Sequence, residues 1–586
     1  MHLVDSSDTR WYECISESWA IVMEKQYIFN RRTLLGGAAA TTTVGLLAAC
    51  GGKKEEEKVK SAGKGAKVED LYDINAHPVS DLKQGGEVRL PLDSIGPDFN
   101  VYSTGGNNGD TYIAMGTLYA AGLWSSSPNG TLELNKDFAV SFDPKEENGK
   151  TVVYVAVNPK AKFNDGTPMD YKALQATWKI LKSTEGDFKI VTSGIYGSVE
   201  KVERDGDDFK VKVTMTSPYY PLNELFASIL HPKMADPKVF NDGFVNNPHP
   251  EFGCGPFKLA DKGWNSTENT FTVVPNEKWW GEKPVLDRII FRTLEDSAER
   301  AAFKNGEIDA ASARTSTAYA EVKNVANAEL RKGQRLFSGG LNLNPKRIED
   351  AKVRKAIFIG TNREALAKIR YQGLPWEEQL PGSRLYLPFE EYYEDNFPKA
   401  DGDAKAAAQK ILEDAGYKKD GEFYAKNGKQ LSYKISIFGD DPVNNSMAQT
   451  FVQNMKELGI NFSVNSRASR EFSKAIPARD YDTTFSGFGI STADGTSATK
   501  QFYYSKDNDG IGSEEIDEMI EKMLVIKDDK ERNKKCNEIE KKHMDEISTV
   551  GTVFNGPDFM MCKKGLANYG PSLFQTIDWA KVGWLK

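Results

Sequence analysis

Ala161–Trp178 reads AKFNDGTPMDYKALQATW, and this stretch joins a turn to a helix directly after a pair of strands. Asp165-Gly166 predicts a tight turn. Thr167-Pro168 is typical of a helix start, so we expect a helix in the following MDYKALQATWKILKS. Upstream, Leu132–Val157 indicates two strands joined by a charged turn. Strands that alternate with helices in this way predict a mixed α/β fold.

Further outward, the first strand of the folded body is expected at Gly85–Leu92, where apolar and polar residues alternate. Asp98–Asp110 follows as DFNVYSTGGNNGD, whose glycines and asparagines indicate a loop with positive φ angles. The next stretch, Thr111–Trp124, has the composition of a helix. The chain therefore enters its first domain through a strand, a polar loop and a helix.

The composition of the 586-residue chain is that of an ordinary globular protein, with 39% hydrophobic and 27% charged residues. Roughly 500 residues follow the N-terminal region, too many for one hydrophobic core, so two or more lobes are expected. The net charge of −8 provides no basic surface, which argues against nucleic acid as a partner.

Cysteine and histidine positions predict no metal centre and no disulfide framework. The five cysteines are widely spaced and odd in number, and the five histidines form no spaced pair with each other or with cysteine. The sequence also contains no phosphate-binding loop and no Gly-x-Ser-x-Gly nucleophile elbow. We therefore expect no metal and no cofactor.

Near the N-terminus, Asn30–Cys50 reads NRRTLLGGAAATTTVGLLAAC and has the features of a secretory signal. Two arginines precede a short apolar run, and small residues precede a cleavage point. Leu47-Ala48-Ala49-Cys50 resembles a bacterial lipobox, in which the cysteine is lipidated and becomes the first residue of the mature protein. Arg31-Arg32 resembles a twin-arginine export signal, and the general export route remains the alternative.

The signal peptide is thus expected at residues 1–49, with either Met1 or Met23 as the true start. Residues 50–84 would comprise the lipidated Cys50 and a flexible tether, because the sequence after Cys50 is rich in charged and small residues. The folded body would then be held at the outer face of the bacterial cytoplasmic membrane, at the cell surface or in the periplasm.

Six segments, in the same order, resemble solute-binding protein family 5. This family includes the oligopeptide- and dipeptide-binding lipoproteins of ATP-binding-cassette (ABC) importers. The segments are LYAAGLW (118–124), AKFNDGTPMDYKALQATW (161–178), GCGPFKL (253–259), NEKWWGEKPVLDRIIF with AERAAFKNGEIDA (276–291 and 298–310), DAKVRKAIFIGTNREAL (350–366) and KAAAQKILEDAGY (405–417). The resemblance covers the chain from about Gly86 to Lys586.

The resemblance implies the two-lobed type II periplasmic-binding-protein fold with an extra subdomain, that is, three α/β subdomains (cluster C). Lobe I would comprise residues 85–337, with the extra subdomain at about 132–234, and would be completed by residues 553–586. Lobe II would comprise residues 338–552. Two crossings, near Leu341–Asn344 and Thr552–Asn555, would form a hinge about which the lobes close on a ligand.

In peptide-binding relatives, an aspartate of lobe II that follows a Gly-Trp motif receives the α-ammonium group of the peptide. The matching stretch here is Gly487-Phe488-Gly489, and Ser491 stands at the position of that aspartate. Serine cannot neutralise an ammonium group, and an unpaired buried charge is costly. Either Asp494 replaces the missing carboxylate, or the ligand is not held by a free amino terminus.

On lobe I, the resemblance places the loop Thr104-Gly105-Gly106-Asn107-Asn108 against the ligand. Its glycines permit close approach of the backbone, and asparagine amides both donate and accept hydrogen bonds. Asn344 and Phe554, at the expected hinge, would line the floor of the cleft.

These inferences predict a lipid-anchored receptor of an ABC importer. It would capture oligopeptides between its lobes and deliver them to the membrane permease, acting as a monomer and carrying out no chemistry. Two alternatives remain: an oligosaccharide-binding receptor of the same fold, and a surface lipoprotein that senses peptides without transport.

Overall fold

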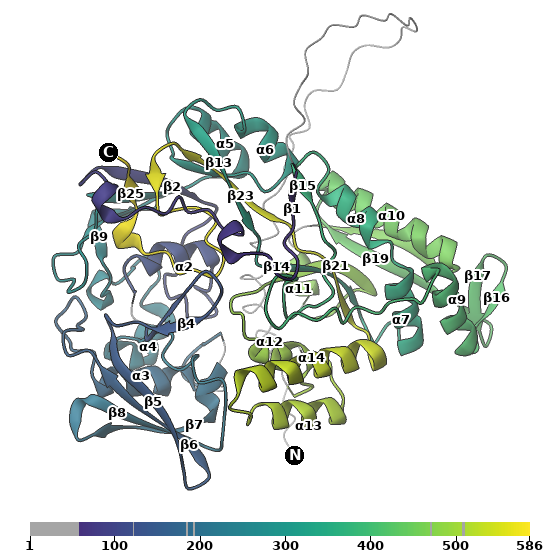
Figure 1. Cartoon of the computed structure of the whole chain (residues 1–586), viewed down its shortest axis with the longest axis horizontal. Helices are drawn as coiled ribbons and strands as arrows, with labels where there is room; N and C mark the ends of the chain where they lie inside the picture. The colour runs from purple at the N-terminus through teal and green to yellow at the C-terminus, as the bar shows by residue number, and fades with distance from the viewer. Residues whose placement is uncertain are drawn as a thin grey trace, which may run out of the picture.

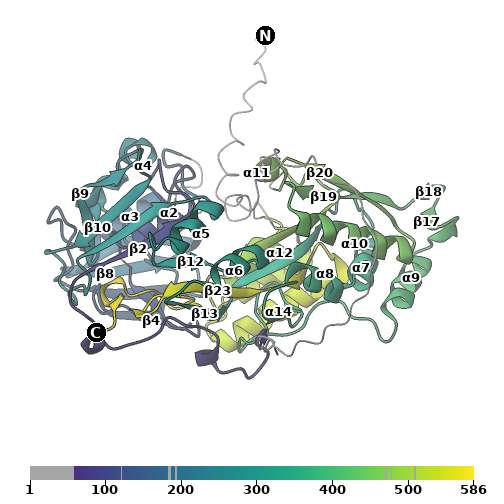
Figure 2. The same ribbon diagram turned by 90° about the horizontal axis from the view of Figure 1, so that it is seen from above.

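A computed structural model describes residues 58–586, apart from 121, 183–185, 192–193, 469–470, 477 and 507–509. Two α/β lobes lie side by side (Figures 1 and 2), which confirms the expected two-lobed fold class. The signal peptide, the choice between Met1 and Met23, and Cys50 lie outside the described residues. In the part of the chain that is described, no helix has both the length and the apolar character needed to cross a bilayer.

Lobe I is built on a four-stranded sheet in which the first two strands listed below are parallel and the other pairs are antiparallel. The strand order is β2 (Glu87–Leu92), β11 (Arg288–Thr293), β10 (Thr270–Pro275) and β9 (Phe257–Asn265). Val88, Leu90 and Leu92 alternate along β2 and are buried, as the sequence pattern predicts. A second sheet, β12 (Ala310–Ser312), β23 (Pro557–Lys563) and β13 (Ala328–Gln334), lies beside it together with α5 (Asp296–Lys304) and α6 (Ser316–Val322).

The helix expected at Thr111–Trp124 is much shorter in the structure. Helix α2 (Gly109–Gly116) begins earlier, because the Asn108 side chain accepts the backbone N–H groups of Asp110 and Thr111. It ends at Gly116, and the carbonyl of Leu118 instead accepts the N–H groups of residues 254 and 255. Trp124 already belongs to a strand, β3 (Trp124–Ser126), which pairs with β4 (Leu132–Leu134).

The lower part of lobe I in Figure 1 is a four-stranded antiparallel sheet with one helix packed on it. Its strand order is β5 (Ala139–Glu147), β6 (Lys150–Val157), β8 (Asp207–Met215) and β7 (Val199–Asp205). Asn148 and Gly149 both have positive φ and form the turn between β5 and β6, which confirms the expected strand pair. Gly166 also has a positive φ, as the expected Asp-Gly turn requires. Helix α3 (Tyr171–Leu181) begins two residues later than expected because Asp170 caps it.

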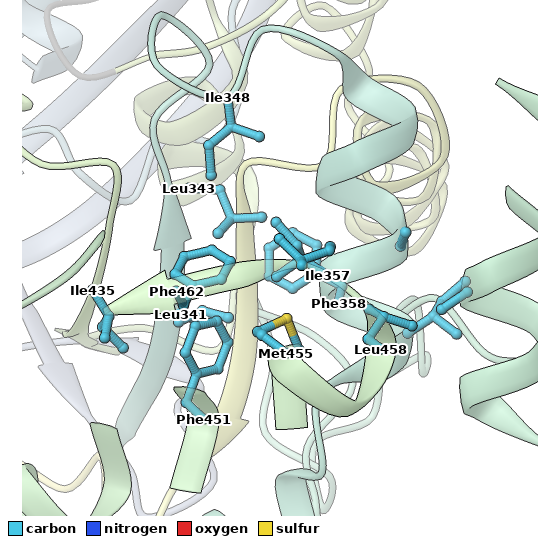
Figure 3. Close-up of a cluster of buried hydrophobic side chains, with 14 of the residues drawn as sticks. Leu341, Leu343, Ile348, Ile357, Phe358, Ile435, Phe451, Met455, Leu458 and Phe462 are labelled. Atoms are coloured by element: carbon cyan, nitrogen blue, oxygen red, sulfur yellow. The ribbon is translucent and has the colours of Figure 1, made fainter. Parts of the chain in front are cut away.

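Lobe II contains a five-stranded mixed sheet. The order is β20 (Asn461–Arg467), β19 (Ser432–Phe438), β21 (Thr483–Gly489), β14 (Phe337–Leu343) and β22 (Val550–Phe554). Its hydrophobic core (Figure 3) lies between the sheet and helices α7 (Ala351–Gly360), α9 (Ala404–Asp414) and α10 (Pro442–Leu458). Helix α8 (Arg363–Arg370) packs beside α10, and α12 (Thr496–Tyr503), α13 (Glu514–Met523) and α14 (Asp529–Glu546) form a separate group with their own core.

The chain passes between the lobes at two adjacent points. The first crossing is Arg335-Leu336, between β13 and β14, and the second is Asn555-Gly556, between β22 and β23. The two are tied together, because the Arg335 N–H donates to the Gly556 carbonyl over 3.2 Å. The first crossing was expected at Leu341–Asn344, which instead lies in β14 and at its end. Every residue of β14 is buried, so this stretch forms the interior of the lobe II sheet.

From Lys58 onward, the segment expected to be a tether is part of the folded body, so the expectation of a flexible segment up to residue 84 is wrong. Strand β1 (Val59–Lys60) pairs in parallel with β15 (Trp376–Glu377). Ala62 is buried, and its N–H donates to the side chain of Gln334, the residue before the first crossing. The charged composition of the segment gave no sign of this arrangement, which depends on pairing with β15, a strand more than 300 residues away along the chain.

Candidate functional site

A cavity of about 300 Å³ lies between the two lobes at the hinge. Lobe I and lobe II both contribute to its walls, and both crossings reach it. The polar and charged lining residues are Asp93, Asn108, Asp110, Asp296, Glu299, Ser312, Arg314, Thr315, Ser316, Arg335, Arg370, Tyr371, Asp441 and Tyr569. A cavity shared by two lobes that are joined by a double crossing is the usual place for a ligand that is enclosed when the lobes close.

The wall contributed by lobe I carries an acidic corner, which we define as Asp93, Asp296 and Glu299. Strands β2 and β11 run parallel, with Leu92 opposite Thr293, so their carboxyl ends meet at one edge of the sheet. Asp93 directly follows β2, and Asp296 begins α5 shortly after β11. One carboxylate oxygen from each of the three residues lies within 4.8 Å of the others, a spacing at which a cation could be held.

Glu299 is the most buried member of the acidic corner, with 6% of its surface exposed. Its Oε1 accepts the Ser312 N–H over 2.7 Å. Burial raises the pKa of Glu299 to about 7, and the neighbouring carboxylates of Asp93 and Asp296 act in the same direction. The charge of the acidic corner therefore changes near neutral pH.

The opposite charge comes from three arginines of the cavity wall. Arg314 is held by Asp558, with 2.6 Å between Nε and Oδ1. Arg370, from α8 of lobe II, lies 4.0 Å from Asp441. Arg335 forms no ion pair with any residue that the structure describes, and its guanidinium lies over the Phe337 ring at 4.3 Å. The cavity is therefore acidic on one wall and contains an unpaired cation at the hinge.

A second cavity, of about 1090 Å³, extends into lobe I and adjoins the first. The two share Ile113, Arg314, Met560 and Tyr569 among their lining residues. The second cavity is lined by polar residues and by ten aromatic side chains, namely Phe99, Tyr102, Tyr112, Tyr119, Trp124, Phe138, Phe244, Trp279, Tyr569 and Trp579. Together the two cavities provide a polar end at the hinge and a roomy aromatic end in lobe I.

The first four loop residues expected to meet the ligand, Thr104, Gly105, Gly106 and Asn107, line neither cavity. The backbone N–H of Thr104 donates to Lys189, and that of Asn107 donates to Ser103. A side chain at Gly106 would lie 2.3 Å from the Asn100 carbonyl oxygen, so glycine is needed there for packing. The last residue of the expected loop, Asn108, does line the hinge cavity.

The expected site residues of lobe II are also absent from the two cavities. Gly487 packs directly against Phe337, and the ring of Phe488 meets Phe502 edge to face at 4.8 Å. Gly489 and Ser491 are exposed. The group lies at and just beyond the end of β21, where it supports packing and the surface of lobe II.

Asn344 and Phe554 line neither cavity, and both make contacts within lobe II. The Asn344 amide donates to the carbonyls of Arg479 and Tyr481, which fixes the end of β14. Phe554 belongs to the core of lobe II and meets the Tyr371 ring edge to face at 5.8 Å.

Asp494 does not offer a free carboxylate to a ligand. Its Oδ2 lies 2.6 Å from Nη2 of Arg532, whose side chain is fully buried. The same oxygen accepts from Asn533, and Oδ1 accepts the Thr496 N–H. The hypothesis that Asp494 replaces the missing aspartate is therefore not supported by its contacts.

Apart from Asn108, the cavity residues were missed because they do not lie in a family-like motif with a known ligand role. One signal was available. Asp93 and Asp296 each follow a strand of lobe I, and ligand sites in α/β sheets gather at the carboxyl ends of parallel strands. The parallel pairing of β2 with β11 could not be read from the sequence, because the strands lie far apart along the chain.

These features define a two-lobed binding protein with a polar cavity at its hinge. The chain belongs to the bacterial extracellular solute-binding proteins, family 5, since the model of that family's middle region matches residues 133–510. This confirms the resemblance seen in the six segments. Members of the family are substrate-binding proteins of transport systems and not enzymes, and this also holds for the present chain.

Among curated relatives, the oligopeptide-binding protein OppA of Mycobacterium tuberculosis is 26% identical over 538 residues, which cover 90% of this chain and 89% of OppA. The nickel-binding periplasmic protein of Escherichia coli is 24% identical over 58% of this chain and 64% of its own.

Solved structures share the fold. The periplasmic EDTA-binding protein EppA has a TM-score of 0.77 at 21% identity and covers 89% of this chain and all of its own. The oligopeptide-binding protein AppA of Bacillus subtilis, in complex with a nonapeptide, has a TM-score of 0.64 at 19% identity and covers 86% of this chain and all of its own.

Proposed function

We propose that this protein is a lipid-anchored receptor that captures oligopeptides in the hinge cavity and delivers them to the membrane permease of an ABC importer. The observation that supports this best is a cavity with walls from both lobes. It has an acidic corner on one wall and, at the hinge, Arg335, which forms no ion pair with a described residue. A peptide has charges of both signs and a polar backbone, so it matches such a wall. The similarity to OppA over 90% of the chain supports the same ligand class.

Lobe closure would bury the ligand and produce the form that the permease recognises. The protein would act as a monomer at the outer face of the cytoplasmic membrane, anchored through Cys50. A test of the anchor is incorporation of a labelled fatty acid in the native host, which we expect to be lost in Cys50→Ser. Equal labelling of that variant would contradict the anchor.

Native mass spectrometry tests the ligand. The body should be produced from Lys58 onward, because Val59–Ala62 belong to the fold. We expect adducts that fragment as peptides, or binding of added tri- to nonapeptides. Adducts spaced by hexose masses would indicate an oligosaccharide receptor, and a metal-chelate mass would indicate a ligand like that named for EppA. A strain that lacks the gene and still grows on the identified peptide as sole nitrogen source would favour sensing over import.

A further inference from the structure

Arg335 occupies a distinctive position at the hinge. It is the first residue of the first crossing, and its backbone N–H is bonded to Gly556 of the second crossing. Its side chain lines the cavity between the lobes. A group bound to this guanidinium would therefore lie where lobe I, lobe II and both crossings meet.

Arg335 has no ion-pair partner among the described residues. No acidic residue in the described part of the chain lies within ion-pair distance of it, whereas Arg314 has Asp558 at 2.6 Å and Arg370 has Asp441 at 4.0 Å. Burial lowers the pKa of Arg335 to about 10; the nearby charges of Arg314 and Arg370 add to the effect, and Asp558 and Tyr371 oppose it. The side chain is still protonated at neutral pH, so an anion in the cavity would relieve both desolvation and repulsion.

We infer that Arg335 seats a carboxylate group of the ligand at the hinge, between Arg314 of lobe I and Arg370 of lobe II. The planar guanidinium presents paired N–H donors that match the two oxygens of a carboxylate. Arg314 and Arg370 remain engaged with their own carboxylates and contribute positive potential from both lobes.

The acidic corner limits what the rest of the ligand can be. Asp93, Asp296 and Glu299 line the same cavity and disfavour a second anionic group. The ligand class is therefore a chain with a carboxylate at the hinge end and a neutral or cationic group toward the acidic corner. This inference rests on the proposed function. It adds that the hinge holds the carboxyl terminus of the peptide and not its amino terminus.

Matched peptides test the inference on the wild-type protein. Each tri- to nonapeptide of a mixture is prepared with a free C-terminal carboxylate and as its C-terminal amide, and the two forms compete in native mass spectrometry. Removing one partner of a buried charge pair costs about 2 kcal/mol or more, so the carboxylate form should be favoured at least about 30-fold. Equal occupancy by both forms would overturn the inference while leaving the proposed function intact. Binding of neither form would overturn both.

Arg335→Met then tests the residue. Methionine keeps an apolar stem over Phe337 and removes the charge, so the preference for carboxylate over amide should fall to about one. Arg335→Lys keeps the charge without the paired donors and should retain part of the preference. The control is Arg288→Met, since Arg288 is exposed on β11 and should keep the full preference. If Arg335→Met still binds peptide and still prefers the carboxylate form over the amide, the inference is overturned. If that variant does not fold, the test rests on Arg335→Lys and on the competition between the two peptide forms for the wild-type protein.

Discussion

Replacing Asp494 by asparagine separates a structural role from a ligand-binding role for this residue. Arg532 is fully buried, and its Nη2 lies 2.6 Å from carboxylates of both Asp494 and Asp529. The Asp529 side chain is 70% exposed, so Asp494 supplies most of the negative charge that stabilises the buried Arg532 guanidinium. Loss of one partner from a buried pair costs about 3–5 kcal/mol, and we expect the lower end, about 3 kcal/mol, because Asp529 remains. The asparagine Oδ1 can still accept the Thr496 N–H.

Hydrogen exchange followed by mass spectrometry measures this effect locally. A loss of about 3 kcal/mol corresponds to roughly 160-fold faster exchange in α12 and α14, with little change in lobe I. The control, Asp529→Asn, should cost less than about 1 kcal/mol because that carboxylate is exposed. Ligand affinity should be unchanged in Asp494→Asn. If hydrogen exchange is unaltered in Asp494→Asn and ligand binding is lost, the structural role is refuted and Asp494 is a ligand-binding residue.

Three further predictions concern stability. Gly556→Ala should destabilise the fold by at least about 1 kcal/mol in thermal unfolding, because Gly556 has a φ of +93° and an added Cβ would lie 2.4 Å from the Tyr371 hydroxyl. Gly402→Ala, at a φ of +98° with open space around it, should cost less, and an equal cost would contradict the clash. Burial raises the pKa of Glu390 from 4.5 to about 8, so its folded form binds the proton more tightly and stability falls as pH rises between these values. Glu390→Gln should flatten this fall by up to about 1.4 kcal/mol per pH unit in denaturant titrations, and an unchanged slope would contradict it. Removing residues 58–63 should lower the melting temperature by deleting β1, and the same temperature would show that this strand adds no stability.

Local rules predicted those parts of the fold that depend on neighbouring residues. The Asn148-Gly149 turn and the Asp165-Gly166 turn follow from residues that tolerate positive φ. Helix α9 covers most of the family-like segment 405–417. The predictions that failed involve distant partners: the helix expected at Thr111–Trp124 stops at Gly116, because the chain beyond it bonds to residues 254 and 255.

The sequence by itself determined the family, the two-lobed class and the transport role, because ordered motifs spread along the chain carry that information. Only the tertiary structure decided the site. Asp93 and Asp296 come together through parallel pairing of distant strands, and the Asp494 carboxylate is paired with Arg532. Arg335 is unpaired because no carboxylate of the described chain folds against it. The interaction between two charges depends on the distance between them in space. For residues far apart along the chain, that distance is set only when the chain folds.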